Sequence, residues 1–153
     1  MTIGKGYIIL CLSIFLVTVG VAYNTGTITQ LATDSTAVQV QLGQGNNAYI
    51  YQSGVGNTSV QKQVYKENLV RIEITGDNNT TWQKQIGKLN KAYGSIQGNN
   101  NLLVQLQIGV ANRSEVTIIG DKNSFSDIQI GYGSITAKHI GNDTIISTTF
   151  FGL

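Results

Sequence analysis

Residues 40–57, VQLGQGNNAYIYQSGVGN, contain one six-residue phrase twice. The phrase Gln-x-Gly-x-x-Asn begins at Gln41 and begins again at Gln52, eleven residues later. Recurrence at a fixed short interval is the sequence signature of a repeat architecture. We therefore followed the phrase through the rest of the chain.

The phrase recurs over most of the chain. Glycine returns at intervals of eleven residues or twice eleven, and asparagine stands three residues after it. Tyr65 occupies one expected glycine position, and Ser134 occupies the last expected asparagine position. Glycine adopts backbone angles that other residues avoid and asparagine tolerates left-handed geometry, so the pattern predicts a turn in every copy. The predicted turn glycines are Gly43, Gly54, Gly76, Gly87, Gly98, Gly109, Gly120 and Gly131, and the asparagines are Asn46, Asn57, Asn68, Asn79, Asn90, Asn101, Asn112 and Asn123.

Alternate copies resemble each other more than neighbouring copies do. Two residues before the glycine position, one set of copies keeps glutamine, whereas the other set changes from Gln52 to isoleucine. The true unit is therefore about 22 residues long and has two unequal halves. Each half carries an alternating β-forming run such as residues 48–52. Strands one unit apart would pair in parallel at about 4.8 Å, which predicts an all-β fold, a two-sheet parallel β-solenoid of roughly five rungs and about 25 Å in height.

Charge predicts which side chains point inward. In one half-repeat, Val70, Ile72 and Ile74 alternate with charged residues, so the aliphatic side chains are expected inside. In the other half, glutamines alternate with a row that contains Lys62 and Lys84. Burying two unpaired lysines would cost roughly several kcal/mol each, whereas stacked glutamine amides can hydrogen-bond along the solenoid. The glutamines expected to form inward columns, beside the asparagines given above, are Gln39, Gln41, Gln61, Gln63, Gln83, Gln85, Gln105, Gln107 and Gln129.

This orientation leaves rows of apolar side chains on the outer face of the glutamine-bearing sheet. Large exposed apolar surfaces usually indicate a partner. The two ends of a solenoid also expose unpaired strand edges, which a monomer would have to cap. The residues expected to form an interface on this outer face are Val40, Leu42, Trp82, Ile86, Leu102, Val104, Leu106 and Ile108.

The composition excludes several classes of protein. A formal net charge of +2 provides no strong basic field for nucleic acid. A hydrophobic content of 41% is too high for a disordered chain, although only 12% of residues are charged. After a leader of 22 residues, the chain divides into an N-terminal segment with a degenerate first half-repeat (23–34), the repeat solenoid (35–134) and a degenerate C-terminal repeat (135–153).

Residues 1–22 are predicted to be a secretory signal peptide. Lys5 precedes an uncharged apolar run over 7–21, and small residues precede a cleavage site after Ala22. An uncleaved membrane anchor is the alternative, but the apolar run is short for a spanning helix. Cys11, the only cysteine, lies in this segment, so the mature chain would be exported with no disulfide.

The repeat resembles that of the curlin family, the subunits of curli, which are extracellular amyloid fibres of bacteria. Residues 35–52 fit the curlin pattern S-x5-Q-x-G-x-x-N-x-A-x3-Q throughout, and partial fits continue to about residue 134. The resemblance implies a secreted subunit that leaves through an outer-membrane secretion apparatus and polymerises at the cell surface. It implies a fimbrium component of biofilm and cell adhesion, with itself or a second curlin subunit as partner.

The family has a major subunit, which forms the fibre, and a minor subunit, which nucleates the fibre and ties it to the cell. This chain departs from the strict pattern because isoleucine replaces the second glutamine at positions 74, 96 and 118. Tyr65 replaces a glycine, and lysine or arginine occurs within strands. These departures, with the divergent stretch 135–153, are more similar to the minor subunit, and the major role stays open.

Residues that could perform chemistry are sparse. His139 is the only histidine, so it is interpreted as a solvated or turn residue rather than a metal ligand. The acidic residues are scattered, and the pairs Gly76-Asp77 and Gly120-Asp121 lack the pattern of calcium-binding nonapeptide repeats. No nucleophile, base and orienting group can be assembled. We therefore expect no enzyme activity, no cofactor, no metal and no small-molecule substrate.

Three other solenoid functions were weighed. A left-handed β-helix acyltransferase would need a hexapeptide period, and an ice-binding solenoid would need a regular Thr-x-Thr ladder; the sequence has neither. A monomeric cell-surface adhesin with a solenoid stalk is the stronger alternative. Dye binding by the purified protein over time would separate a polymerising subunit from such an adhesin.

Overall fold

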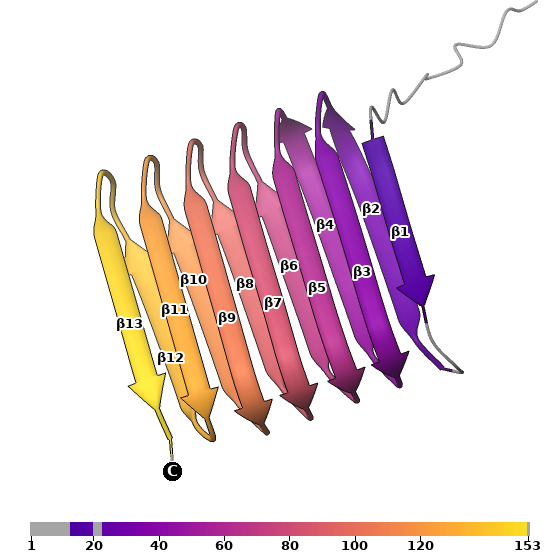
Figure 1. The fold of residues 1–153 in the computed structure, drawn as a ribbon. Coiled ribbons are helices and arrows are strands. Elements are labelled where there is room, and N and C mark those ends of the chain that lie inside the picture. Colours follow the sequence, from indigo (N-terminus) through magenta and orange to yellow (C-terminus); the bar gives the residue numbers. More distant parts are fainter. Residues whose placement is uncertain (1–12, 20–22, 153) are drawn as a thin grey trace, which may run out of the picture.

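The computed structural model of the chain describes residues 13–19 and 23–152, and for 13–19 it describes the backbone alone. The described residues form an all-β structure of thirteen strands (Figure 1). Turns of two or four residues join the strands from β2 to β13. The strands are β1 Ser13–Val19, β2 Thr25–Thr33, β3 Thr36–Gln44, β4 Asn47–Val55, β5 Thr58–Lys66, β6 Leu69–Thr75, β7 Thr80–Lys88, β8 Lys91–Gln97, β9 Leu102–Val110, β10 Arg113–Ile119, β11 Ser124–Gly131, β12 Ser134–Ile140 and β13 Ile145–Phe151.

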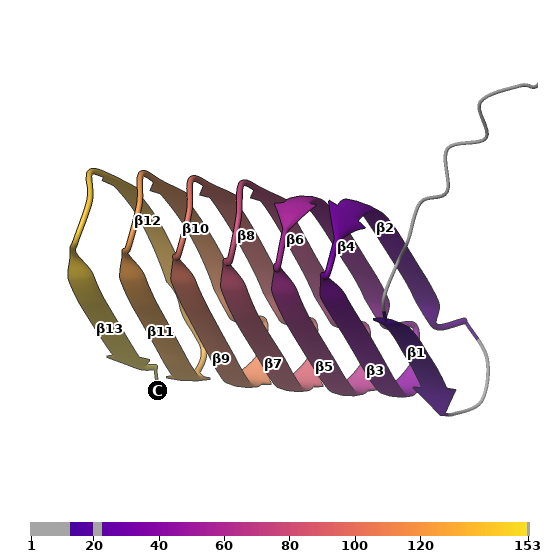
Figure 2. The ribbon, with the colours of Figure 1, turned by 90° about the horizontal axis from the view of Figure 1, so that it is seen from above.

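The strands form two parallel sheets that face each other (Figure 2). The odd sheet has seven strands in the order β1-β3-β5-β7-β9-β11-β13, and the even sheet has six in the order β12-β10-β8-β6-β4-β2. The predicted two-sheet parallel β-solenoid is therefore confirmed. Strands β2 to β13 are twelve in number and make six rungs, one more than the roughly five expected, because the degenerate segments at both ends of the repeat also form strands.

The register within both sheets follows the 22-residue unit. Gln41 pairs with Gln63 in the odd sheet, and Ile50 pairs with Ile72 in the even sheet. The last rung is one residue shorter, so that Arg113 pairs with Ser134. Because parallel strands one unit apart carry equivalent residues, side chains of one kind stack in columns along the solenoid.

Strand β1 lies in the segment that the sequence analysis assigned to a signal peptide. Its backbone extends the odd sheet beyond β3, with Leu16 opposite Gln39 and Thr18 opposite Gln41. The other signal-peptide residues, 1–12 and 20–22, lie outside the described part of the chain. The cleavage of this segment stays a prediction.

The turns use left-handed backbone geometry at two positions. The turn glycines have positive φ, as in Gly76 at +124°, and a Cβ added there would lie 2.1 Å from the carbonyl oxygen of Gly98 in the next rung. The second left-handed position is the residue directly before the column asparagine, for example Leu89 with φ 61°. The expectation that asparagine itself takes this geometry is wrong for the column asparagines. Their buried amides bond to the neighbouring rung instead.

The interior divides into two chemically different halves. The even strands contribute aliphatic side chains, including Ile50, Ile72 and Val116, which are buried with their neighbours in one cluster. The odd strands contribute the glutamines, and Gln39 and Gln85 are both fully buried. The orientation predicted for both halves is therefore the observed one.

Candidate functional site: polar ladders and open ends

The glutamine columns form hydrogen-bonded ladders in the odd sheet, one from β3 to β9 and the other from β3 to β11. From Gln39 to Gln107, each amide nitrogen of the columns has two acceptors. Gln61 Nε2 donates to Gln83 Oε1 at 2.9 Å and to the carbonyl oxygen of Tyr49 in the even sheet at 2.9 Å. Gln63 Nε2 likewise donates to Gln85 Oε1 at 3.1 Å. The ladders therefore join successive rungs and also join the two sheets, which satisfies the amides away from water.

The asparagine columns form a second pair of ladders at the turns. The backbone N–H and Nδ2 of Asn68 both donate to Asn46 Oδ1, each at 3.1 Å, and Nδ2 also donates to the carbonyl oxygen of Gly87 at 2.8 Å. The donor direction is opposite to that of the glutamines, because Asn68 donates toward the N-terminal rung. All eight predicted asparagines are buried: Asn46, Asn57, Asn68, Asn79, Asn90, Asn101, Asn112 and Asn123.

A third ladder escaped the sequence analysis. It uses the residue after the turn glycine of the even strands. Asp77 Oδ1 accepts the N–H of Val55 at 2.8 Å, and Asn99 Oδ1 accepts the N–H of Asp77 at 2.8 Å. Asp121 and Asn142 continue the series. The recurrence of Gly-Asp or Gly-Asn at one-unit spacing was the signal in the sequence, so these aspartates are structural rather than scattered.

Asp127 occupies the place of a glutamine in one column, opposite Gln105. Its carboxyl group is buried and accepts hydrogen bonds from the hydroxyls of Ser114 and Thr148, the latter at 3.1 Å. Burial raises the pKa of Asp127, and the two hydroxyl hydrogen bonds oppose that rise. Gln105 Nε2 turns away from the column and donates to Ser114 Oγ at 2.7 Å. The ladder thus ends at Asp127.

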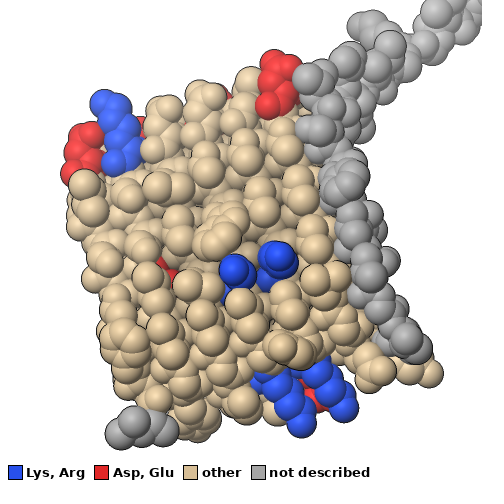
Figure 3. Space-filling view, in the orientation of Figure 1, with Lys and Arg blue, Asp and Glu red and all other residues tan. Residues whose placement is uncertain are grey.

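The outer face of the odd sheet carries the expected apolar rows. Figure 3 looks onto this face and shows a broad uncharged surface with basic side chains near its centre and charged side chains at its margins. Trp82 is 38% exposed, and Lys62 and Lys84 both point outward. The predicted interface residues share this surface, with Leu102 exposed and Val40, Leu42, Ile86, Val104, Leu106 and Ile108 half-buried.

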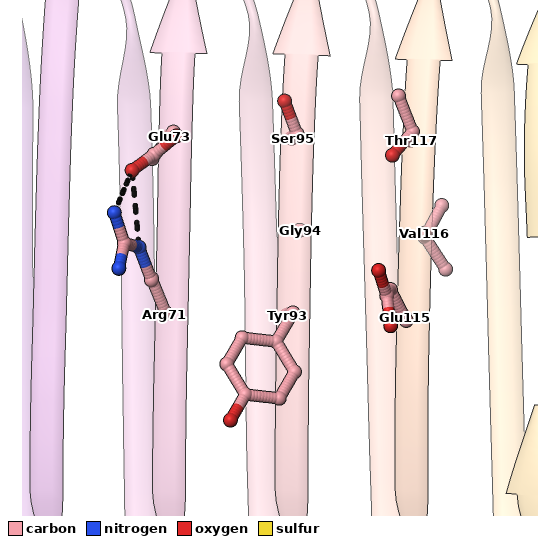
Figure 4. A pocket seen from close by; sticks show the side chains of 8 residues that line it. All are labelled: Arg71, Glu73, Tyr93, Gly94, Ser95, Glu115, Val116 and Thr117. Atoms are coloured by element: carbon pink, nitrogen blue, oxygen red, sulfur yellow. Dashed lines mark hydrogen bonds and ion pairs between the residues drawn. The ribbon is translucent and has the colours of Figure 1, made fainter. Parts of the chain in front are cut away.

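The outer face of the even sheet is polar and contains a shallow groove. The groove lies where Gly94, which has no side chain, and Ser95, which has a short one, stand between residues with longer side chains (Figure 4). Arg71 forms an ion pair with Glu73, which raises the pKa of the Arg71 guanidinium, and lies 5.0 Å from the ring centre of Tyr49. Arginine and glutamate that satisfy each other on an exposed face make an ordinary solvated surface.

His139 is not the solvated or turn residue that the sequence analysis expected. It lies in β12, half-buried, with Nε2 3.1 Å from Asn123 Oδ1. Its register partner is Ile118, so it occupies the inward row of the last even strand. Among the described residues, no group of three or more histidine, cysteine, aspartate or glutamate side chains could hold a metal ion.

The two ends of the solenoid differ in their side chains. At the C-terminal end, β12 and β13 leave Ile145 and Phe151 largely exposed. At the N-terminal end, β2 is the edge of the even sheet and β1 covers β3 in the odd sheet. Within 13–19 and 23–152, no segment folds across either end as a cap. Open strand edges of this kind can template further pairing.

These observations define the class: a two-sheet parallel β-solenoid with a half-amide, half-aliphatic interior. Comparison of the chain with protein-family models, with curated proteins and with solved structures finds no match. A search of the described residues for a helix long and apolar enough to cross a membrane also finds none.

Proposed function

We propose that the chain is a secreted curli-type fibre subunit, a structural component of extracellular fibres in biofilm and adhesion. It would leave the cell through an outer-membrane secretion apparatus and assemble with itself or with a second curlin subunit. The observation that carries the proposal is the continuity of the stack: amide hydrogen bonds link β3 to β9 in one column and β3 to β11 in the other, and parallel strand pairing continues to edges that no segment of 23–152 caps. A structural role without cofactor or catalysis belongs to the same proposal.

In-register amide columns and parallel strands are the two features that stabilise cross-β assemblies. A rung added to either end would meet strand edges of the spacing and direction found inside the chain. The sequence resemblance to curlin repeats, which rests on the same glutamine and asparagine positions, supports the same proposal.

The minor, nucleating role is favoured over the major role. Isoleucine replaces glutamine in the even column at Ile74, Ile96 and Ile118, and Asp127 interrupts an odd column. Both changes reduce the number of stacked amides toward the C-terminal end. A subunit that initiates a fibre tolerates such a loss better than one that forms its whole length.

The direct test is assembly of the purified chain that begins at Tyr23. At tens of micromolar we expect fibres that bind amyloid dye and diffract at about 4.8 Å. The alternative, a monomeric cell-surface β-solenoid adhesin, predicts a protein that keeps the same circular dichroism spectrum but stays monomeric and dye-negative for days. That second result would remove the fibre proposal.

A further inference from the structure

The glutamine ladders have a fixed direction. Gln39 Nε2 donates to Gln61 Oε1 at 3.1 Å and to the carbonyl oxygen of Thr27 at 2.9 Å. Gln41 Nε2 donates to Gln63 Oε1 at 2.9 Å and to the carbonyl oxygen of Thr25 at 2.9 Å. A flipped amide would aim oxygen at a carbonyl oxygen, so the opposite sheet sets the orientation. From Gln39 to Gln107, each column amide nitrogen except that of Gln105 therefore donates toward the C-terminal rung, and the amide oxygen that accepts this bond faces the N-terminal rung.

This direction leaves two acceptors open at the N-terminal end. Gln39 Oε1 and Gln41 Oε1 are buried and accept no hydrogen bond from the described side chains. In the register of the odd sheet, Leu16 and Thr18 of β1 stand opposite these glutamines. Leucine has no side-chain donor and threonine has one hydroxyl donor, so by residue type β1 matches at most one of the two acceptors.

The chemistry of a matching strand follows from the two open oxygens. Adjacent members of the columns lie on one strand, two residues apart, and each needs an N–H donor from a strand that pairs in parallel with β3. A glutamine at both positions is what the interior of the sheet supplies at every rung from Gln61 and Gln63 to Gln83 and Gln85. The fitting edge is therefore a strand with Gln-x-Gln on its inward face.

The C-terminal edge of this same chain does not supply that pattern. On β13 the two columns continue as Thr148, opposite Asp127, and Phe150, opposite Gln129. The Thr148 hydroxyl already donates to Asp127 Oδ1 at 3.1 Å, and phenylalanine has no donor. A second copy stacked head to tail would therefore give Gln39 Oε1 and Gln41 Oε1 no amide donor.

We infer that the N-terminal edge of β3, through Gln39 Oε1 and Gln41 Oε1, is a docking site for a different β-solenoid subunit whose exposed terminal strand carries Gln-x-Gln, and that Phe150 restrains this chain from elongating on itself. The inference rests on the proposed function and names the partner that it requires. Growth is then directional, with the N-terminal end of this chain as the receiving end.

Strand β1 occupies the same edge of β3 in the described structure. The chain from Tyr23 lacks β1 but keeps β2 to β13 and every residue of the two buried hydrophobic clusters. Removal of the predicted leader therefore opens the docking edge and keeps every described core residue. The chain with its leader is expected to receive partners more slowly than the chain from Tyr23.

The test converts the C-terminal edge into a matching partner. Phe150→Gln continues the Gln129 column, whereas Phe151→Gln is a matched control because Phe151 is 71% exposed and faces outward. Preformed seeds of the chain from Tyr23 are supplied with monomer of the unmodified chain, of F150Q or of F151Q. We expect F150Q to add about tenfold faster than the other two, because a buried acceptor gains its donor. Seeds carrying Gln41→Met should lose this advantage, since methionine keeps the volume but accepts poorly.

Equal addition rates for all three monomers would overturn the inference while fibre formation stood. An F150Q advantage that survives on Q41M seeds would also overturn it, because the gain would not come from the proposed acceptor. If the unmodified chain forms no seeds, F150Q is incubated alone. Assembly of F150Q then supports the docking chemistry and removes only the proposed self-assembly. If neither the unmodified chain nor F150Q assembles, the result contradicts both the proposed fibre function and the proposed docking site.

Discussion

The two inner faces of the solenoid solve the same packing problem with opposite chemistry. In the even sheet, side chains such as Ile72 and Ile96 fill the interior by apolar burial. In the odd sheet, glutamines such as Gln61 and Gln83 fill it with amides that bond along the stack and across to the other sheet. Apolar burial is non-directional, whereas an amide ladder fixes the axial position of each strand. The comparison shows that the even half of each rung supplies apolar burial, whereas the odd half fixes the register between rungs.

The largest effect should come from breaking the aliphatic half. Ile72 is fully buried, and its Cδ1 fills the space beside Gly94, where an added Cβ would lie 2.3 Å away. Ile72→Ala should lower the free energy of unfolding by about 2–5 kcal/mol, because Gly94 has no side chain that could relax into the cavity. Denaturant unfolding of the monomer measures the loss. Ile72→Val is the matched control, with an expected loss of about 0.5–1.5 kcal/mol.

Breaking the amide half should have a smaller effect. Gln85→Ala removes a fully buried amide that links Gln63 to Gln107. It should cost about 1–3 kcal/mol because neighbouring amide groups lose their partners. Lys84→Ala, on the outward side of the same strand, should cost under about 1 kcal/mol. A larger loss for Lys84 than for Gln85 would contradict the structural role of the ladder.

A third effect concerns the amide half alone and is the pH dependence of its stability. Asp127 replaces a glutamine in the ladder, and burial raises its pKa in the folded chain. The folded state therefore holds this proton more tightly than the unfolded state, so the group stabilises the fold at low pH. That contribution should be lost as pH rises from about 4 through the raised pKa. Unfolding measured across this range should show the decline in the unmodified chain.

Asp127→Asn is the control for that decline, because an amide of similar shape does not titrate. The stability of the D127N chain should therefore lack the part of the decline that comes from position 127 over the same pH range. A decline of equal size in D127N would assign the pH dependence to other groups. The effect is expected to be smaller than that of Gln85→Ala, because the hydroxyl hydrogen bonds partly offset the burial.

The smallest expected effect concerns the outer face of the odd sheet and leaves the interior unchanged. Trp82 is the only tryptophan and is 38% exposed on the odd sheet. Its fluorescence should be accessible to a soluble quencher in fresh monomer and protected after assembly, since a large aromatic is a typical interface anchor. Quenching that does not change on assembly would show that the odd face stays free in the fibre.

Much of this structure could be predicted from residue spacing. The repeat fixed the parallel register, and the row containing Lys62 and Lys84 fixed the inward side of the odd strands, because a charge excludes its row from the interior. Asp127 could also have been placed, since it stands one unit after Gln105. The sequence places it among scattered acidic residues, and an acidic residue is rarely buried without a visible partner.

Other features could not be predicted from spacing. The direction of the ladders depends on where the opposite sheet places its carbonyl oxygens, which the repeat does not encode. The position of His139 in the interior row follows from a one-residue shortening at the turn between β11 and β12, which places it on the column of Ile118. The pairing of β1 with β3 joins residues whose sequence indicates a leader rather than a repeat.

The alternation of two unlike half-repeats has a consequence for how such a chain can change in length. Gain or loss of one whole rung leaves every column continuous, since glutamine still follows glutamine and isoleucine still follows isoleucine. Gain or loss of a single half-repeat moves every strand that follows it into the opposite sheet. Gln85 would then stand in line with aliphatic residues, and Ile72 in line with amides. Natural length variation in this architecture should therefore occur in steps of a full rung, and half-rung variants should be found only at the ends.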